Sequence, residues 1–329
     1  MPANDTCGSL GTYTKFLVEN SITTDPCPPA TFDGDSERYE ILSENIQYSD
    51  ITVGGRGMTG TLDPIATHLR NGARLVFGRV AMEVGPIQLT NWLPRILGND
   101  AAGTTFATDV TFDMNPFDIM LKRDAGTVIY RHCGVNRCLL RGRNGGGSGD
   151  DPEQTMQMIL DIVGFEEHDA TYPATEPALP ASDELYWIIA DGALTLDTPA
   201  DDTEYYFDAF NLLINNNLTP KNWNFLSTTC IQSRGRDIRL QVSTPYTSDS
   251  HTNLYINRFQ GEGVLNFLGT KNLGGTAQSP YQTTMTFPNL RQTRRTPATR
   301  GPGDIPLSLD LKAYRTSSEE PLTIVNTDS

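Results

Sequence analysis

The chain has 329 residues, of which 37% are hydrophobic, and a net charge of −15. This length is sufficient for a sizeable core in one large domain or two smaller ones, and no stretch approaches the roughly 18 consecutive apolar residues that a membrane helix needs. Because DNA is a polyanion, the negative charge disfavours a protein that grips DNA. The acidity, with 20 arginines against 5 lysines, fits a solvated surface with arginine-rich interfaces, or else a salt-adapted host.

The first 37 residues are predicted to form an extended N-terminal arm. They are rich in Gly, Pro, Thr and Asp and hold one short apolar run at Phe16-Leu17-Val18. No basic segment followed by an apolar one opens the chain, so we expect a protein that is made inside a cell and not secreted. Its cysteines are then reduced by default, although Cys7 and Cys27 could pair in an oxidising medium.

Strands and one helix are predicted in the next segment. Residues 39–51 contain short strand-like runs, and 74–84 alternates apolar and polar side chains as a strand with one buried face does. The apolar residues of 86–98 recur at helical spacing, with a proline at the start and a glycine as a stop. Pro94 lies inside this segment, so the helix is expected to bend or to end early.

The chain then continues as β-strands up to a Gly- and Pro-rich insert at 142–183. The insert opens on a flexible break and holds a short helix or strand at 152–165. A turn at Asp124-Ala125-Gly126 predicts a hairpin between two of the preceding strands. The strands predicted before the insert lie at 108–114, 117–123, 127–132 and 134–141.

The C-terminal third shows the clearest pattern. Its runs alternate apolar and polar residues and are separated by Gly, Pro, Asn and Thr, which is typical of an antiparallel sandwich or barrel. The two halves of the chain echo each other loosely, which is consistent with an internal duplication that the sequence alone does not demonstrate. Apolar strand runs lie at 185–196 and 205–214, and the alternating runs follow at 238–242, 253–259, 263–268, 282–288 and 305–311.

These patterns predict a mainly β fold. We expect an antiparallel β-sandwich or barrel with a short flanking helix, long loops and an extended N-terminal arm. Residues 1–37 are assigned to the arm, 38–315 to the β domain with its insert, and 316–329 to a C-terminal tail.

No constellation of residues predicts catalysis, a cofactor or a metal site. The glycine-rich stretch 142–149 lacks the Gly-Lys-Ser/Thr ending of a phosphate loop. His132 and Cys133 are neighbours on a predicted strand, so their side chains point to opposite faces and do not readily share a metal. Cys133 and Cys138 have the wrong spacing for a CxxC zinc site, and no nucleophile elbow or zinc-protease motif occurs. We therefore do not expect an enzyme.

Two charged segments are the candidates for function. The first is an acidic stretch without calcium-loop spacing, whose ordinary interpretation is a solvated face. It consists of Asp197, Asp201, Asp202, Glu204 and Asp208. The second is a Pro- and Thr-rich loop whose arginines suit an interface with an acidic neighbour or a nucleic-acid arm. Its members are Arg291, Arg294, Arg295 and Arg300.

The order of these elements resembles that of tail tube proteins, the major tail proteins of long-tailed phages and related archaeal tailed viruses. The resemblance covers about residues 38–315 and rests on the pattern and the order of the elements. It is carried by the strand at 73–84, the amphipathic segment at 89–97, the strand and hairpin of 117–130, and the closing segments at 238–242, 285–290 and 305–311.

The resemblance implies a structural virion protein with no cofactor and no catalysis. In this family, protomers join into a ring, usually six-fold, whose inner strands form a barrel around a DNA-sized channel, and the rings stack into a tube. The implied partners are further copies of the chain, a tape measure protein, and the tail terminator and distal tail proteins. DNA passes without specific binding, no membrane is involved, and the protein is assembled in the host cytoplasm into the virion tail.

On this interpretation the acidic residues line the channel and keep DNA centred by repulsion, while the arginines pair with carboxylates of the next protomer. Two alternatives stay open at this point. One is another virion β-protein, such as a tail terminator, a baseplate component or a capsid decoration, and the other is a carbohydrate-binding or hydrolase β-module. The sequence does not specify the ring symmetry or the strands that face the lumen.

Overall fold

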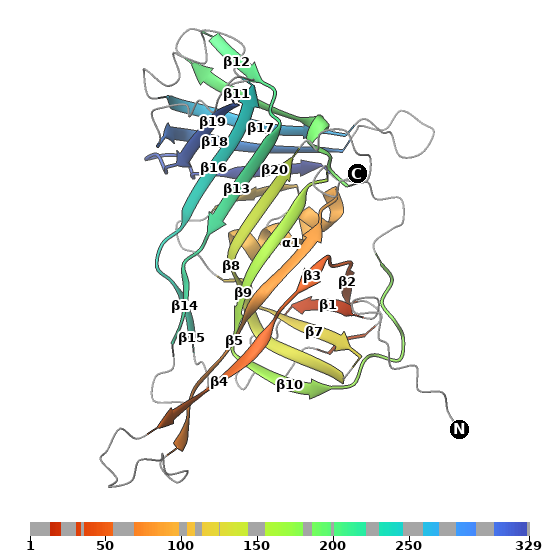
Figure 1. Ribbon diagram of the computed structural model, residues 1–329. Helices are drawn as coiled ribbons and strands as arrows, with labels where there is room; N and C mark the ends of the chain where they lie inside the picture. The colour runs from red at the N-terminus through yellow and green to blue at the C-terminus, as the bar shows by residue number, and fades with distance from the viewer. Residues whose placement is uncertain are drawn as a thin grey trace.

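The fold is mainly β with one α-helix in the described residues, and every strand pair there is antiparallel (Figure 1). This confirms the predicted fold class. The computed structural model describes residues 14–20, 31–33, 36–54, 69–98, 104–108, 114–124, 126–143, 155–179, 186–198, 201–221, 230–245, 259–269, 281–293 and 306–327.

The helix α1 spans Pro86–Leu97. The strands are β1 Lys15–Asn20, β2 Glu37–Tyr39, β3 Ser43–Glu44, β4 Gln47–Gly54, β5 Leu69–Glu83, β6 Thr105–Ala107, β7 Phe117–Arg123, β8 Gly126–Arg143, β9 Gln157–Gly164, β10 Glu166–Ala170, β11 Gly192–Thr198, β12 Asp201–Tyr205, β13 Ala209–Asn215, β14 Leu218–Lys221, β15 Cys230–Ser233, β16 Asp237–Pro245, β17 Gln260–Leu268, β18 Gln282–Gln292, β19 Pro306–Ala313 and β20 Thr323–Thr327.

Eight strands form one continuous sheet in the order β4–β5–β9–β8–β13–β16–β19–β18. Alternation along each strand places one face of this sheet in the core: Phe210, Leu212 and Ile214 of β13 are buried, and the residues between them are only half-buried. A second layer, β12–β11–β17–β18–β20–β6, closes the other side of the core. β18 belongs to both layers, so the sandwich is continuous along one side.

The long strand β8 joins these layers to a third sheet, β2–β1–β7–β8–β10. Its first half pairs with β7 and β10, and its second half with β9 and β13. We expected two strands here. Instead His132 takes a positive φ of 50°, and its backbone N–H donates to Asp118 at 2.8 Å, so the strand changes sheets without ending.

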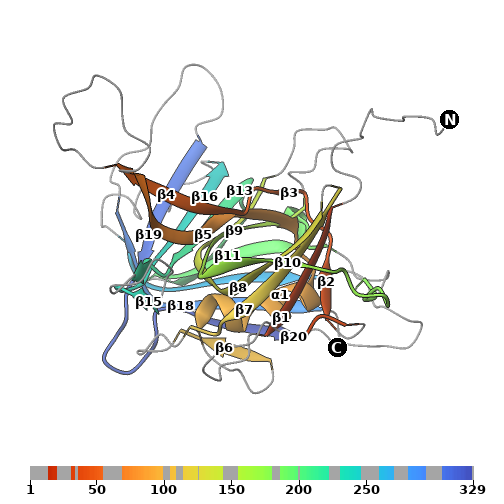
Figure 2. The same cartoon turned by 90° about the horizontal axis from the view of Figure 1, so that it is seen from below.

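The helix α1 lies beside β8, β6 and β20, between the layers (Figure 2). It starts at Pro86 and is closed by Gly98 in the left-handed conformation, as predicted. The expectation that Pro94 ends it early is wrong, because the helix continues for three more residues to Leu97. Its apolar face is fully or almost fully buried and consists of Leu89, Trp92, Leu93, Ile96 and Leu97.

Two segments differ from their predicted roles, whereas the insert holds a strand within 152–165, one of the two elements expected there. Residues 15–20, assigned to the arm, form β1, which pairs with β2 and β7 and buries Phe16, Leu17 and Val18 completely. Residues 323–327, assigned to the tail, form β20 between β18 and β6. The insert contributes β9, whose apolar run forms a central strand, and β10. The other predicted boundaries stay predictions, and the strand expected at 253–259 lies almost wholly outside the described residues.

Candidate assembly surfaces

The outer face of the eight-stranded sheet carries charged side chains in rows that cross the strands. Strand register places Arg79 of β5 beside Asp161 of β9, and Asp161 beside Arg137 of β8. Arg79 Nε lies 2.6 Å from Asp161 Oδ1. Opposite charges on neighbouring strands stabilise a pairing by roughly 0.2–1 kcal/mol. The charged residues of this face include the cations Arg79, Arg137, Arg141, Arg143, Arg239, Arg291 and Lys312 and the acids Glu83, Asp161, Asp237 and Asp310.

Asp237 is a carboxylate of this face that is paired with two cations. Its Oδ1 lies 2.7 Å from Lys312 Nζ, and its Oδ2 lies 2.7 Å from Arg239 Nε. Partial burial alone would raise the pKa of Asp237, but the hydrogen bonds and charges of Lys312 and Arg239 outweigh it and hold the pKa below its ordinary value.

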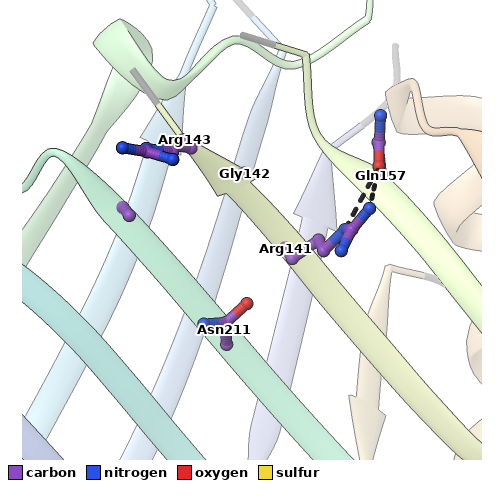
Figure 3. A pocket seen from close by; sticks show the side chains of 6 residues that line it. Arg141, Gly142, Arg143, Gln157 and Asn211 are labelled. Atoms are coloured by element: carbon purple, nitrogen blue, oxygen red, sulfur yellow. Dashed lines mark hydrogen bonds between the residues drawn. The ribbon is translucent and has the colours of Figure 1, made fainter. Parts of the chain in front are cut away.

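A shallow hollow of about 200 Å³ lies on the same face, over β8, β9 and β13 (Figure 3). Arg141 points across to Gln157, and its Nε and Nη2 donate to Oε1 at 3.2 and 3.0 Å (Figure 3). Asn211 and Arg143 line the hollow from β13 and the end of β8. A neighbouring hollow of about 420 Å³ extends towards β16 and β19. Both are polar grooves across a sheet, so they suit contact with a macromolecule better than an enclosed reaction site.

The outer face of the second layer carries few charged side chains. Across β11, β17, β18, β20 and β6, the register brings half-buried or exposed uncharged residues into line. On the same face, the exposed acids Asp197 of β11 and Glu262 of β17 lie at one end of their strands. Depletion of charge is typical of the core of protein interfaces. The residues of this uncharged patch are Thr105, Ala107, Ala193, Thr195, Val264, Asn266, Leu268, Gln282, Thr284, Thr286, Thr323, Val325 and Thr327.

The acidic candidates lie together at one edge of this second layer. Asp197 of β11 is opposite Asp202 of β12, and Asp201 is the next residue in the register. Glu204 lies on the same edge strand, and Asp208 follows it shortly before β13. The side chains of Asp197, Glu204 and Asp208 are exposed. The structure therefore gathers the acidic residues at a corner of the sandwich and does not spread them over a sheet face.

Only one of the four arginine candidates falls in the described residues. Arg291, expected in a loop, lies in β18 and is exposed, and its guanidinium lies 5.4 Å from the ring centroid of Tyr314. Arg294, Arg295 and Arg300 lie outside the described residues. Their place at a contact between protomers stays a prediction.

The described residues also bear on the cysteines, on metal binding and on membrane helices. Cys133 and Cys138 are free and fully buried, and burial raises the pKa of both thiols. No group of three or more His, Cys, Asp or Glu side chains in the described residues could hold a metal ion. No helix there has the length and apolar character needed to cross a membrane. Cys7 and Cys27 lie outside the described part of the chain.

Sequence reasoning missed the charged rows of the large sheet. Their members come from strands far apart along the chain, such as Arg79, Asp161 and Arg137, and only the pairing register brings them together. Alternation shows that each of these residues faces away from the core, but it does not show which strands are neighbours.

A comparison with protein families gives one match, to the model described as phage tail tube protein, over residues 28–313. A comparison with curated proteins finds no match. The matched segment contains all but the first and last strands of the fold, including the eight-stranded sheet and the helix. This chain belongs to the phage tail tube protein family.

Proposed function

We propose that this protein is the repeating subunit of a viral tail tube, in which rings of subunits stack around a channel for DNA ejection. The observation that carries the proposal is the family match over residues 28–313, which identifies a structural tail protein and not an enzyme family. The proposal needs surfaces that join copies of the chain, and the fold offers them at its sheet edges.

Open edges are the feature of the fold that suits self-assembly. In the described residues, β2, β4, β10 and β12 each pair along one edge only. An exposed edge presents unpaired N–H and C=O groups and is a template for another strand. A ring that joins some of these strands across protomers satisfies their groups, while contacts between rings stay open and extend the tube.

The acidic corner is our candidate for the channel wall. DNA must move along the whole tube, and repeated arginine–phosphate contacts would accumulate into tight binding. Carboxylates repel the phosphates over about 10 Å at 0.1 M salt. The gathering of Asp197, Glu204 and Asp208 as exposed residues at one edge supports this assignment, and Arg291 with the three arginines that follow it is assigned to a contact between protomers.

Further partners follow from the same proposal. A tube needs a tape measure protein to set its length and terminator and distal tail proteins at its ends, and these are expected to bind the ring surfaces. The place of action is the virion tail, after assembly in the host cytoplasm.

Negative-stain electron microscopy of the purified protein tests the proposal. We expect long hollow tubes built from stacked rings. A protein that stays monomeric at high concentration, or that forms only isolated particles of another shape, would contradict it.

The channel wall has its own test. The triple variant Asp197→Asn, Glu204→Gln, Asp208→Asn should form tubes that retain more DNA at low salt than the unchanged protein, because the wall no longer repels phosphate. A matched control neutralises three exposed carboxylates elsewhere, with Glu40→Gln, Asp124→Asn and Glu319→Gln, and should leave DNA retention unchanged. Equal retention by the triple variant and the control would remove the acidic corner from the channel.

A further inference from the structure

The strands of this chain form the same arrangement twice. In the first unit, β1 to β10, the order of pairing is β2–β1–β7–β8–β9–β5–β4, with β10 added to β8. In the second unit, β11 to β20, it is β12–β11–β17–β18–β19–β16–β13, with β20 added to β18. These seven pairings of the first unit recur in the second, and the equivalent strands follow one another in the same order along the chain.

An irregularity in the pairing recurs at the equivalent place. Phe117 of β7 is opposite Cys133 of β8, and Ile119 is opposite Tyr130, so β7 advances by two residues where β8 advances by three. Gly261 of β17 is opposite Leu290 of β18, and Gly263 is opposite Phe287, so β17 likewise advances by two residues where β18 advances by three. Bulges are specified by local sequence and are not defects, so the same bulge between equivalent strands supports a duplicated unit.

The equivalent strands β9 and β19 also share sequence. Each has eight residues, and Leu160-Asp161-Ile162 of β9 corresponds to Leu309-Asp310-Leu311 of β19 in position and in burial. In both, the aspartate faces outward between two core residues. Each unit also has a long hairpin in the large sheet, β4–β5 in the first and β13–β16, extended by β14–β15, in the second. Both hairpins project beyond the body on the same side (Figure 1).

Two joints connect the units within the chain. β8 of the first unit pairs with β13 of the second, from Arg137 opposite Asn215 to Arg143 opposite Ala209. β20 of the second unit pairs with β6, which belongs to the first. The second unit therefore uses one edge of β13 and one edge of β20 to join its neighbour.

The equivalent edges of the first unit are unoccupied in the described residues. β13 corresponds to the β3–β4 segment, which pairs only with β5. β20 corresponds to β10, which pairs only with β8. The second unit joins the first through the edges of β13 and β20. The equivalent edges of the first unit, on β3–β4 and β10, are therefore the ones left open.

We propose that a second copy of this chain occupies these edges and repeats the internal joint, so that the second unit of one chain pairs with the β3–β4 and β10 edges of the first unit of the next. This inference rests on the proposed function and deepens it. Continued around a circle, one type of joint closes a heterologous ring, in which each chain supplies two units. A ring of six units then contains three chains, which revises a ring of six chains. The arginine candidates Arg294, Arg295 and Arg300 follow the β18 end directly in the sequence.

Hydrogen–deuterium exchange of dissociated protomers and assembled rings tests the joint on the unchanged protein. Backbone amides that enter a ladder are protected from exchange. We expect residues 43–50 and 166–170 to become at least tenfold slower to exchange on assembly, while 201–205, an edge strand with no role in the joint, changes little. Rings whose residues 43–50 exchange as fast as in the protomer would overturn this inference alone. A protein that forms no rings would contradict the proposed function as well.

Two proline variants provide a matched comparison. Ser49→Pro lies on the proposed joint, and Thr203→Pro lies on the edge strand β12, outside it. Proline cannot donate to a ladder and blocks the addition of a strand. At protein concentrations where Thr203→Pro assembles normally, Ser49→Pro should need at least tenfold more protein to form rings, with the two protomers equally folded by circular dichroism. Equal assembly by both variants would count against the joint, and if Ser49→Pro fails to fold, the exchange measurement decides.

Discussion

The two units share a strand order but fill their cores differently. Around α1, the first unit packs the rings of Phe16, Tyr39 and Trp92 against Phe117, and it includes the almost fully buried Arg95. The second unit packs a cluster of aromatic rings made up of Trp187, Phe207, Phe210 and Phe267, and none of its described buried residues is charged. The comparison teaches that alternation and bulges specify the pairing, whereas the filling of the core can vary.

The units are nevertheless not independent, because α1 of the first is held by side chains of the second. Asn216, fully buried, donates from Nδ2 to the carbonyl of Ile96 at 2.8 Å, and Asn326 donates to that of Pro86 at 2.8 Å. Arg236 Nη2 reaches the carbonyl of Leu97 at 2.6 Å. The bonds from Asn216 and Arg236 satisfy carbonyls of the last turn, which have no partner within the helix. The bond from Asn326 anchors the first residue of the helix. We therefore expect the dissociated protomer to unfold in one transition.

The largest effects are expected from the two aromatic cores. Trp92→Ala in the first unit and Phe267→Ala in the second should each lower the free energy of unfolding by about 3–5 kcal/mol, because each removes a fully buried ring and leaves a cavity. Urea unfolding of the dissociated protomers measures both. A loss below 1 kcal/mol for either variant would show that its unit is not cooperatively folded with the other.

The second largest effect is expected from the buried ion pair of the first unit, Arg95 and Glu37. Arg95 Nη1 lies 2.6 Å from Glu37 Oε2 and also contacts the faces of Trp92 and Phe117. Glu37→Ala leaves a buried cation without its partner, which costs about 3–5 kcal/mol, and we expect the lower end because Asn20 still accepts from Arg95. The control is Asp161→Ala at the exposed Arg79 pair, where about 0–1 kcal/mol is expected. Equal losses from both variants would contradict the buried role of Arg95.

The link between the units comes third. Asn216→Ala removes the donor to Ile96 and Val135 and leaves two buried carbonyls without it, for which we expect a loss of about 1–3 kcal/mol. Asn211→Ala, on the outer face of the adjoining strand, is the control and should change stability by less than about 0.5 kcal/mol. A neutral Asn216→Ala would mean that α1 does not depend on the second unit.

The smallest effect concerns acid. Because the pKa of Asp237 is lowered by Lys312 and Arg239, its contribution is present above the unfolded-state pKa of about 3.9 and is lost as the pH falls through the folded-state value. Asp237→Asn should therefore make the melting temperature depend less on pH below about pH 4. Above pH 5, the melting temperatures of the variant and the unchanged protein should change with pH in parallel. An unchanged slope below pH 4 would exclude this carboxylate from acid unfolding.

Much of the fold could be predicted from the sequence where a strand has one buried face. The strands at 117–123 and 263–268 and the limits of α1 follow from periodicity and punctuation alone. β1 and β20 could not be predicted, because each is a short apolar run in polar surroundings and gains its stability from pairing with distant strands.

The sequence suggested an internal duplication but could not demonstrate it. Its units share little more than the short Leu-Asp runs of β9 and β19, and the evidence for it is the order and register of pairing. For the candidate surfaces, adjacency in sequence was enough to group the carboxylates of β11 and β12, but not to show that they lie at an edge.

The most direct test of the account is the number of chains in one assembled ring. Native mass spectrometry of released rings gives it as a multiple of the chain mass of 36.2 kDa, and electron cryomicroscopy of the tube shows the symmetry. The account predicts three chains per ring, with six similar units and the β3–β4 edge of each chain paired to the next. A ring of six chains, each contributing one set of strands to the channel, would contradict it.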